Sequence, residues 1–134
     1  MNAELERLVW QRAGSRCEYC RLPQIGSRAT FEIDHIIARQ HRGPTVAGNL
    51  ALSCVYCNGR KGPNLTGRDP ATGKLTRLYH PRRHKWPYHF RYQGSTIIGR
   101  TAIGRATIDV LRMNHPPLMA LREIQIAAGL FQQP

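Results

Sequence analysis

The sequence predicts an α+β fold in which a small ββα unit, held together by a four-cysteine zinc site, follows an N-terminal helix and precedes a C-terminal hairpin and further helices. The first observation is two cysteine pairs, Cys17/Cys20 and Cys54/Cys57, each with a spacing that lets both thiolates reach one ion from a single tight turn. The second is the order strand, loop, strand, helix around the second pair. At 134 residues we expect one domain: an N-terminal helix to residue 16, a zinc-held core at 17–62 and a basic extension at 63–134.

The four cysteines have two alternative uses, a zinc site or two disulfides. Disulfides belong to oxidising compartments, and the N-terminal residues form an amphipathic helical pattern rather than a secretory leader. We therefore expect a reducing, cytoplasmic setting with structural zinc. The sequence has no apolar run near the roughly 20 residues that a membrane helix needs, so no membrane association is predicted.

Residues 2–13 are predicted to form the first helix. Apolar residues recur at helical spacing, Asn2 is a suitable N-cap, and Gly14 follows as a C-terminal stop. We interpret the apolar stripe of this helix as a packing surface. The next segment, residues 21–28, contains Pro23 and Gly26 and is expected to be a loop.

The clearest strand covers residues 30–37, where Phe31 and Ile33 share one face while Glu32 and Asp34 share the other. A loop at 38–48 and a second strand at 49–53 then lead to the second cysteine pair. A helix that begins at about Cys57 would place Asn58 and Lys61 three residues apart on one face near its positive N-terminal end, a suitable place for a phosphate. These elements make up the ββα unit.

The extension is predicted in less detail. Residues 62–87 hold four prolines and three glycines, so we expect an irregular crossing with a turn at 69–73. Strands at 88–92 and 95–98 form a hairpin around Gln93-Gly94. Thr101 caps a helix that ends before Asn114, and a last helix covers 117–128.

The composition is strongly basic. Twenty Lys and Arg stand against eight Asp and Glu, a formal charge of +12, and between Asp34 and Asp109 thirteen Lys or Arg face a single acidic residue, Asp69. Such an excess favours a polyanion, and above all nucleic acid, over a merely solvated surface or a membrane.

Three side chains carry the chemistry that phosphodiester hydrolysis requires. Asp34 and Asn58 offer oxygen ligands suited to a hard cation such as Mg²⁺ or Mn²⁺. His35 is a candidate general base, because imidazole is the side-chain group that ordinarily exchanges a proton near neutral pH. Because neighbours on a strand point to opposite faces, Asp34 and His35 address one phosphate only if the strand ends or bulges there.

The chain resembles the HNH nuclease family, in its branch with a four-cysteine zinc site, through four motifs in order: Cys17-x2-Cys20, Glu32-x-Asp34-His35, Asn49-Leu50 and Cys54-x2-Cys57-Asn58-x2-Lys61. The resemblance covers residues 17–62, about a third of the chain. Residues 81–90 and 104–107 also look like the tail of small stand-alone bacterial HNH proteins. The fold implied is the ββα-metal, treble-clef-like HNH core.

The resemblance also implies roles. His35 would be the general base, Asp34 and Asn58 the ligands of the catalytic cation, and Asn49 the residue that holds the loop and the His35 ring. The cysteines would bind the structural zinc. Many members have His where this chain has Asn58, giving a His-Asn-Asn variant whose amide oxygen suits Mg²⁺ better than softer metals.

DNA is the expected partner, bound through its backbone with weak sequence preference, and a protein partner would supply any targeting. The candidate DNA contacts are Arg39, Arg60, Lys61, Arg82, Arg83 and Lys85. Interruption by proline and basic residues favours phosphate contacts or aromatic packing over a second metal site for His80, His84 and His89. The alternative to a nuclease is a zinc-ribbon protein that binds nucleic acid without cutting it.

Overall fold

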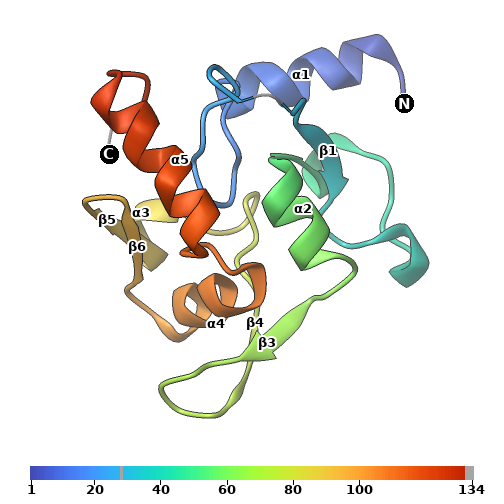
Figure 1. Cartoon of the computed structure of the whole chain (residues 1–134). Helices are drawn as coiled ribbons and strands as arrows, with labels where there is room; N and C mark the ends of the chain where they lie inside the picture. Colours follow the sequence, from blue (N-terminus) through green and yellow to red (C-terminus); the bar gives the residue numbers. More distant parts are fainter. Residues whose placement is uncertain (28, 132–134) are drawn as a thin grey trace.

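A computed structural model describes residues 1–27 and 29–131. In this part of the chain, three two-stranded antiparallel sheets lie among five α-helices and two short 3-10 helices (Figure 1). The helices are α1 Ala3–Ala13, α2 Val55–Lys61, α3 Trp86–His89, α4 Ala102–Leu111 and α5 Pro116–Ala127, with 3-10 turns η1 Arg39–His41 and η2 Ala47–Asn49. The strands are β1 Glu32–His35, β2 Leu50–Ser53, β3 Thr66–Arg68, β4 Leu75–Arg77, β5 Phe90–Gln93 and β6 Thr96–Gly99.

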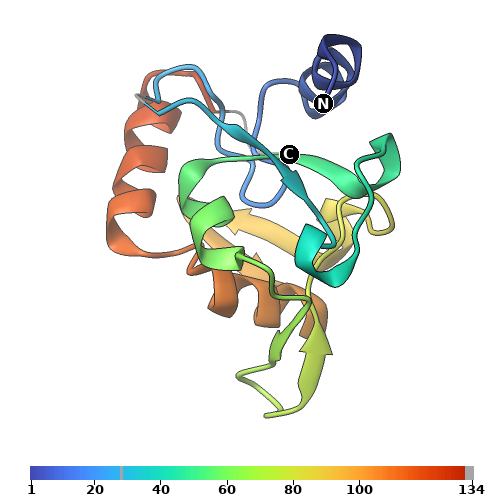
Figure 2. The ribbon, with the colours of Figure 1, turned by 90° about the vertical axis from the view of Figure 1, so that its right-hand side faces the viewer.

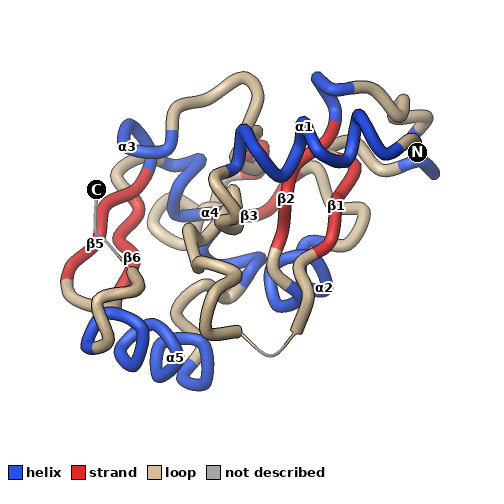
Figure 3. The backbone as a smooth tube through the Cα atoms, turned by 90° about the horizontal axis from the view of Figure 1, so that it is seen from above, coloured by secondary structure: helices blue, strands red, loops and turns tan. Residues whose placement is uncertain are grey.

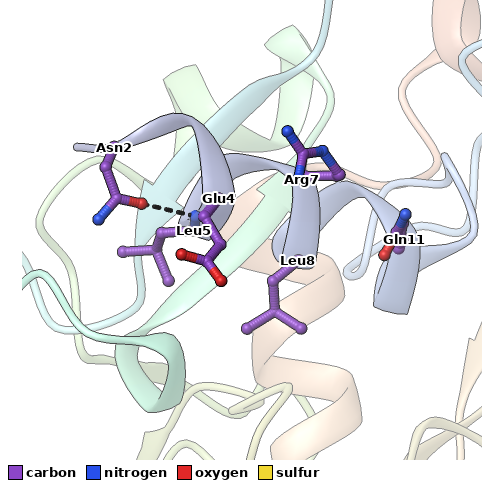
Figure 4. Close-up of a pocket in the computed structure, with 6 residues that line it drawn as sticks. All are labelled: Asn2, Glu4, Leu5, Arg7, Leu8 and Gln11. Atoms are coloured by element: carbon purple, nitrogen blue, oxygen red, sulfur yellow. Dashed lines mark hydrogen bonds between the residues drawn. The ribbon is translucent and has the colours of Figure 1, made fainter.

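Helix α1 forms where the sequence predicts it. The Asn2 side chain accepts a hydrogen bond from the Leu5 amide at 2.8 Å, as Figure 4 shows, and Gly14 ends the helix with a left-handed φ of 63°. Val9 is buried against the core, whereas Leu8 lies 43% exposed beside a hollow along the helix. The apolar stripe is therefore a packing surface only in part. Figure 3 shows α1 lying across β1 and β2.

The ββα unit is confirmed, with shorter elements than predicted. β1 and β2 pair antiparallel, with Asp34 opposite Ala51 and His35 opposite Leu50. β1 ends at His35, and Asp34 and His35 both keep the regular register of the ladder, so their side chains point to opposite faces. α2 lies beside this sheet (Figure 2).

Helix α2 begins earlier than expected. Cys54 is its N-cap, with a sulfur that accepts from the Cys57 amide at 3.4 Å, so the helix starts at Val55 rather than at Cys57. Lys61 is consequently the last helical residue and not a residue near the positive N-terminus. That expectation was wrong because the cap, not the second cysteine, sets the start of the helix.

The segment expected to be irregular contains a hairpin instead. β3 and β4 pair antiparallel and project from the rest of the molecule, as Figures 1 and 2 agree. The residues of β3 and β4 show no apolar alternation, so the sequence pattern did not predict these strands. The hairpin is held instead by its turn and by contacts with α4. At the turn, Asp69 accepts from the Ala71 amide and from Thr72. A side chain at Gly67 would lie 2.4 Å from Val110 of α4, so only glycine fits this approach.

The second hairpin and the last two helices are confirmed. β5 and β6 turn at Gly94, Thr101 caps α4 by accepting from the Gly104 amide at 3.1 Å, and α5 begins at Pro116. The predicted strand at 88–92 is shorter, because the one-turn helix α3 takes residues 86–89 and buries Trp86.

The extension packs directly on the first cysteine pair. The Trp86 indole donates to the Tyr19 carbonyl at 2.7 Å, and the Tyr92 hydroxyl donates to the Cys20 carbonyl at 2.6 Å. Arg82 forms an ion pair with Glu18. Core and extension thus share one hydrophobic cluster. No helix within the described residues combines the length and apolarity needed to cross a membrane.

Candidate functional site

The four cysteines meet in one buried cluster. Cys17 and Cys20 come from the turn after α1, Cys54 from the end of β2 and Cys57 from the first turn of α2, and all four Sγ atoms lie within 4.8 Å of one another. The Cys20 and Cys54 sulfurs are 3.8 Å apart. Tetrahedral zinc with Zn–S bonds of about 2.3 Å places its sulfurs about 3.8 Å apart. The cluster therefore has the donor set and spacing of a structural zinc site.

The electrostatics of the cluster favour a bound cation. Hydrogen bonding with Cys17 and Cys54, together with complete burial, raises the pKa of Cys20 and of Cys57 well above the usual range. Four thiolates packed without a counter-charge would repel one another. A divalent cation removes that repulsion, because thiolates are its ligands.

Asp34 faces α2 and Tyr19, which lies between the first two cysteines. Its carboxylate is 3.3 Å from the Lys61 ammonium and accepts from the buried Tyr19 hydroxyl at 3.5 Å. Burial raises the pKa of Asp34 above its ordinary value, although Lys61 opposes that change. Burial dominates because only 14% of the Asp34 side chain is exposed.

Asn58 stands one turn before Lys61 on α2 and opposite the other carboxylate of β1. Its amide nitrogen donates to Glu32 at 2.8 Å. Residues 32 and 34 therefore form two parallel contacts with α2, Glu32 with Asn58 and Asp34 with Lys61. The contact with Glu32 uses the nitrogen of Asn58 and leaves its amide oxygen as the available ligand atom.

His35 contacts the loop that follows β1. Its Nε2 lies 2.8 Å from the Thr45 hydroxyl, and no hydrogen bond in the described part of the chain joins it to Asp34 or Asn58. This matches the alternation of neighbours on a strand. Thr45 was not singled out from the sequence, where nothing distinguishes it from other loop threonines.

Asn49 organises that loop. Its side chain is buried, accepts from the Ile37 amide at 2.9 Å, and donates to the carbonyls of Ile37 at 3.0 Å and Pro44 at 2.9 Å. These bonds fix the loop backbone on both sides of its 3-10 turn. Asn49 thus acts on the loop that carries Thr45, and its hydrogen bonds among the described residues go to that loop rather than to the His35 ring.

The expected DNA-contacting residues differ in their surroundings. Arg39, Arg83 and Lys85 are exposed and Arg60 is half-buried. Lys61, in contrast, is buried and paired with Asp34, while Arg82 is paired with Glu18. Three further residues stabilise the site: Tyr19, Glu18 and Trp86. Nothing in the sequence pointed to them, because their contacts join segments far apart in the chain.

The three histidines of the extension form a packed cluster. His80 and His84 accept from backbone amides at 3.1 and 2.9 Å, and His89 lies 2.7 Å from the Thr101 hydroxyl. Burial lowers the pKa of all three, that of His80 to about 4. Among residues 1–27 and 29–131, the group of three or more His, Cys, Asp or Glu side chains that could hold a metal ion is the cysteine cluster.

Comparison with known proteins agrees with this geometry. Residues 17–64 match the model of the family described as HNH endonuclease. The chain is also similar to the Septu protein PtuB of Bacillus thuringiensis, with 25% identity over 104 residues that make up 76% of this chain and 38% of that protein. The chain therefore spans well under half the length of this relative. No solved structure gives a significant match.

Proposed function

We propose that this chain, whose residues 17–64 form an HNH domain, is a metal-dependent endonuclease that hydrolyses phosphodiester bonds of DNA. The observation that carries the proposal is the facing of β1 and α2, in which Asp34 contacts Lys61 and Glu32 contacts Asn58, with His35 at the end of the same strand. The match to the family supports a nuclease at the level of the domain. The strongly basic composition supports a nucleic-acid substrate.

In this proposal, Asp34 and the amide oxygen of Asn58 hold Mg²⁺ or Mn²⁺, since hard cations prefer oxygen ligands. Bound there, the cation neutralises charge on the phosphate and on the leaving oxygen. Glu32 acts on the proposed cation site through Asn58. It accepts a hydrogen bond from the amide nitrogen of Asn58 and so leaves the amide oxygen free for the cation.

His35 is the proposed general base. It takes a proton from water, the water oxygen bonds to phosphorus, and the 3′-oxygen leaves with the electron pair of the broken P–O bond. Thr45 orients the imidazole through its contact with Nε2, and Asn49 holds the loop that carries Thr45. Thr45 and Asn49, neither of which contacts the substrate in this proposal, therefore set the orientation of the His35 ring.

Lys61 has two successive partners in this scheme. In the structure its ammonium is 3.3 Å from the Asp34 carboxylate, where it supplies the positive charge that a half-buried acid needs. With a divalent cation bound at Asp34, the Lys61 ammonium would lose this partner and would be available to a substrate phosphate. Arg39, Arg60, Arg83 and Lys85 supply further backbone contacts, which carry little sequence information.

The test is cleavage of supercoiled plasmid in Mg²⁺ or Mn²⁺. Loss of a positioned general base typically costs about 10²- to 10⁴-fold in rate, so His35→Ala should lose cleavage while zinc content and DNA affinity stay near the parent values. His41→Ala is the matched control, because His41 is exposed in the same loop region. Parent protein that binds DNA but leaves the plasmid intact in both metals would instead identify a non-catalytic zinc-ribbon module.

A further inference from the structure

A small cavity lies where the ββα core meets the extension. Its volume is about 100 Å³, several times the roughly 10–15 Å³ that one water requires. The floor is apolar, with Ile36 from the core and Leu78 from the extension. The polar lining consists of Lys61, Asn64, Arg77, His80 and Arg83. The site therefore exists only when the two parts of the chain are folded together.

The lining carries positive charge that nothing in it neutralises. Asp and Glu are absent from the residues that line the cavity. The ion pairs found within the described ranges occupy Lys61, Arg82 and Arg105, which leaves Arg77 and Arg83 without a carboxylate partner there. Both arginines are exposed on the outer side of the cavity, so an anion reaches them directly.

His80 adds a neutral donor to these cations. Burial, followed by the nearby Arg83, lowers its pKa to about 4, so the ring is uncharged at neutral pH. Its Nδ1 accepts the Arg82 amide at 3.1 Å, which leaves the proton of the neutral ring on Nε2. A neutral Nε2–H is a hydrogen-bond donor that holds its proton across the physiological range.

The cavity adjoins the proposed reaction centre through Lys61. This residue lines the cavity, and its ammonium is also 3.3 Å from the Asp34 carboxylate. A group bound in the cavity is thus next to the place where the scissile phosphate would meet the cation. Guanidinium groups match phosphate oxygens with paired N–H donors. Arg77 and Arg83 are therefore suited to binding a phosphate.

We propose that this cavity is a phosphate subsite, in which Arg77, His80 and Arg83 hold a backbone phosphate of the DNA strand adjacent to the scissile phosphate. The inference rests on the proposed nuclease function and adds three phosphate-binding side chains from the extension, outside the residues that match the family model. It assigns the extension a direct part in binding the substrate: Arg77, His80 and Arg83 hold the strand next to the reaction centre.

The first experiment measures DNA affinity against salt in the His35→Ala background with Mg²⁺, so that no cleavage is needed. Each phosphate contact contributes about 0.9 to the slope of log affinity against log salt for duplex DNA. The double variant Arg77→Gln/Arg83→Gln should lower that slope by about one to two. Arg7→Gln/Arg91→Gln is the matched control, because it removes the same charge from exposed positions on α1 and β5.

The second experiment locates the contact. Short duplexes carry one neutral methylphosphonate at each successive position around a preferred cut site or, without one, around the centre of the footprint. In the parent background, one position next to the central phosphate should weaken binding about five- to tenfold, as loss of a charge-assisted hydrogen bond predicts. In the Arg77→Gln/Arg83→Gln variant the same substitution should have no further effect.

The outcomes separate this inference from the nuclease proposal. If Arg77→Gln/Arg83→Gln and its control show equal salt slopes and the methylphosphonate profile is unchanged, the subsite is overturned, even if the parent cuts DNA. An uncut plasmid with the predicted slope and profile overturns the nuclease but keeps the subsite. Stabilisation by inorganic phosphate that the variant abolishes, with DNA binding unchanged, assigns the cavity to a free anion and also overturns the inference. Zinc content and thermal unfolding confirm that each variant is folded.

Discussion

Asp34 combines two properties that oppose each other, a charged role and a half-buried position. Burial disfavours its ionised form, whereas Lys61 and the Tyr19 hydroxyl favour it. The result is a raised pKa, so the carboxylate keeps its proton to a higher pH than an exposed aspartate does. A catalytic cation at this position must therefore displace the Lys61 ammonium group and, below the raised pKa of Asp34, a proton as well.

Metal binding should consequently depend on pH through Asp34. The concentration of Mn²⁺ at half-saturation of the His35→Ala variant should fall as the pH rises, by at most about tenfold per pH unit, and level off above the raised pKa. The effect of Asp34 on folding stability has the opposite sign. Because the folded state favours protonated Asp34, this stabilisation of the fold is lost as the pH rises through the raised pKa.

Asp34→Asn is the control for this prediction, because an amide has no proton to lose in this range. Its Mn²⁺ affinity should be weaker and nearly independent of pH. The same pH dependence in Asp34→Asn as in the parent background would assign the titrating group elsewhere.

At the level of elements, the loop between β1 and β2 depends on a close approach of its backbone. A Cβ atom at Gly43 would lie 1.7 Å from the Ile37 carbonyl oxygen and 2.9 Å from the Asn49 amide nitrogen. The hydrogen bonds of Asn49 and the absence of a side chain at Gly43 are therefore two parts of one arrangement. Thr45 and the direction of the His35 ring depend on both.

Gly43→Ala should displace this loop and lower the cleavage rate by at least tenfold, while zinc content stays at the parent value. Gly48→Ala is the matched control in the same loop, because a Cβ there meets nothing within 4 Å. Cleavage assays and metal analysis on both variants decide the point. Equal rates for the two variants would show that the loop does not position the base.

The β3–β4 hairpin depends on a single acid. Asp69 is buried and accepts from Arg105 at 3.0 and 2.9 Å as well as from the residues of its own turn. These hydrogen bonds, those of Arg105 foremost, hold the pKa of Asp69 well below its usual range. The stability they contribute is present above the ordinary aspartate pKa and is lost as the pH falls through the lowered value.

Asp69→Asn should therefore lower the thermal midpoint at neutral pH and reduce the difference between neutral and acid pH. The control is Asp109→Asn on α4, an exposed acid that has no ion pair in the described part of the chain. Circular dichroism melts between about pH 3 and 7 test both variants. A melting curve for Asp69→Asn that follows the parent across this range would contradict the prediction.

At the level of the whole molecule, the cysteine cluster joins segments more than thirty residues apart, and the extension packs on it through Trp86 and Tyr92. The core, the candidate site and the proposed phosphate subsite all adjoin this cluster or the elements that it connects. Loss of the metal should therefore destabilise every part of the fold rather than the cluster alone.

Protein purified without added zinc should contain about one equivalent, and removal of the metal by a strong chelator should unfold both core and extension together. Structural zinc contributes on the order of 10 kcal/mol or more of folding free energy in small domains at neutral pH. Metal analysis and near-ultraviolet circular dichroism of the buried Trp86 report the two events. Less than half an equivalent, with an unchanged spectrum after chelation, would exclude the role.

The sequence by itself was sufficient for the features that depend on local pattern. Cysteine spacing predicted the metal cluster, alternation predicted β1 with Glu32 and Asp34 on one face, and capping residues predicted α1 and α4. These signals are strong because each depends on residues within one turn or one strand, where backbone geometry leaves few alternatives.

Only the tertiary structure decided which groups meet. It showed that Lys61 faces Asp34, that Asn58 faces Glu32 and that Thr45, rather than Asn49, contacts His35. It also revealed a hairpin in the segment expected to be irregular, because Asp69 is held by Arg105, thirty-six residues away. Such contacts leave no periodic trace in the sequence, since they arise from the packing of elements whose separation along the chain is arbitrary.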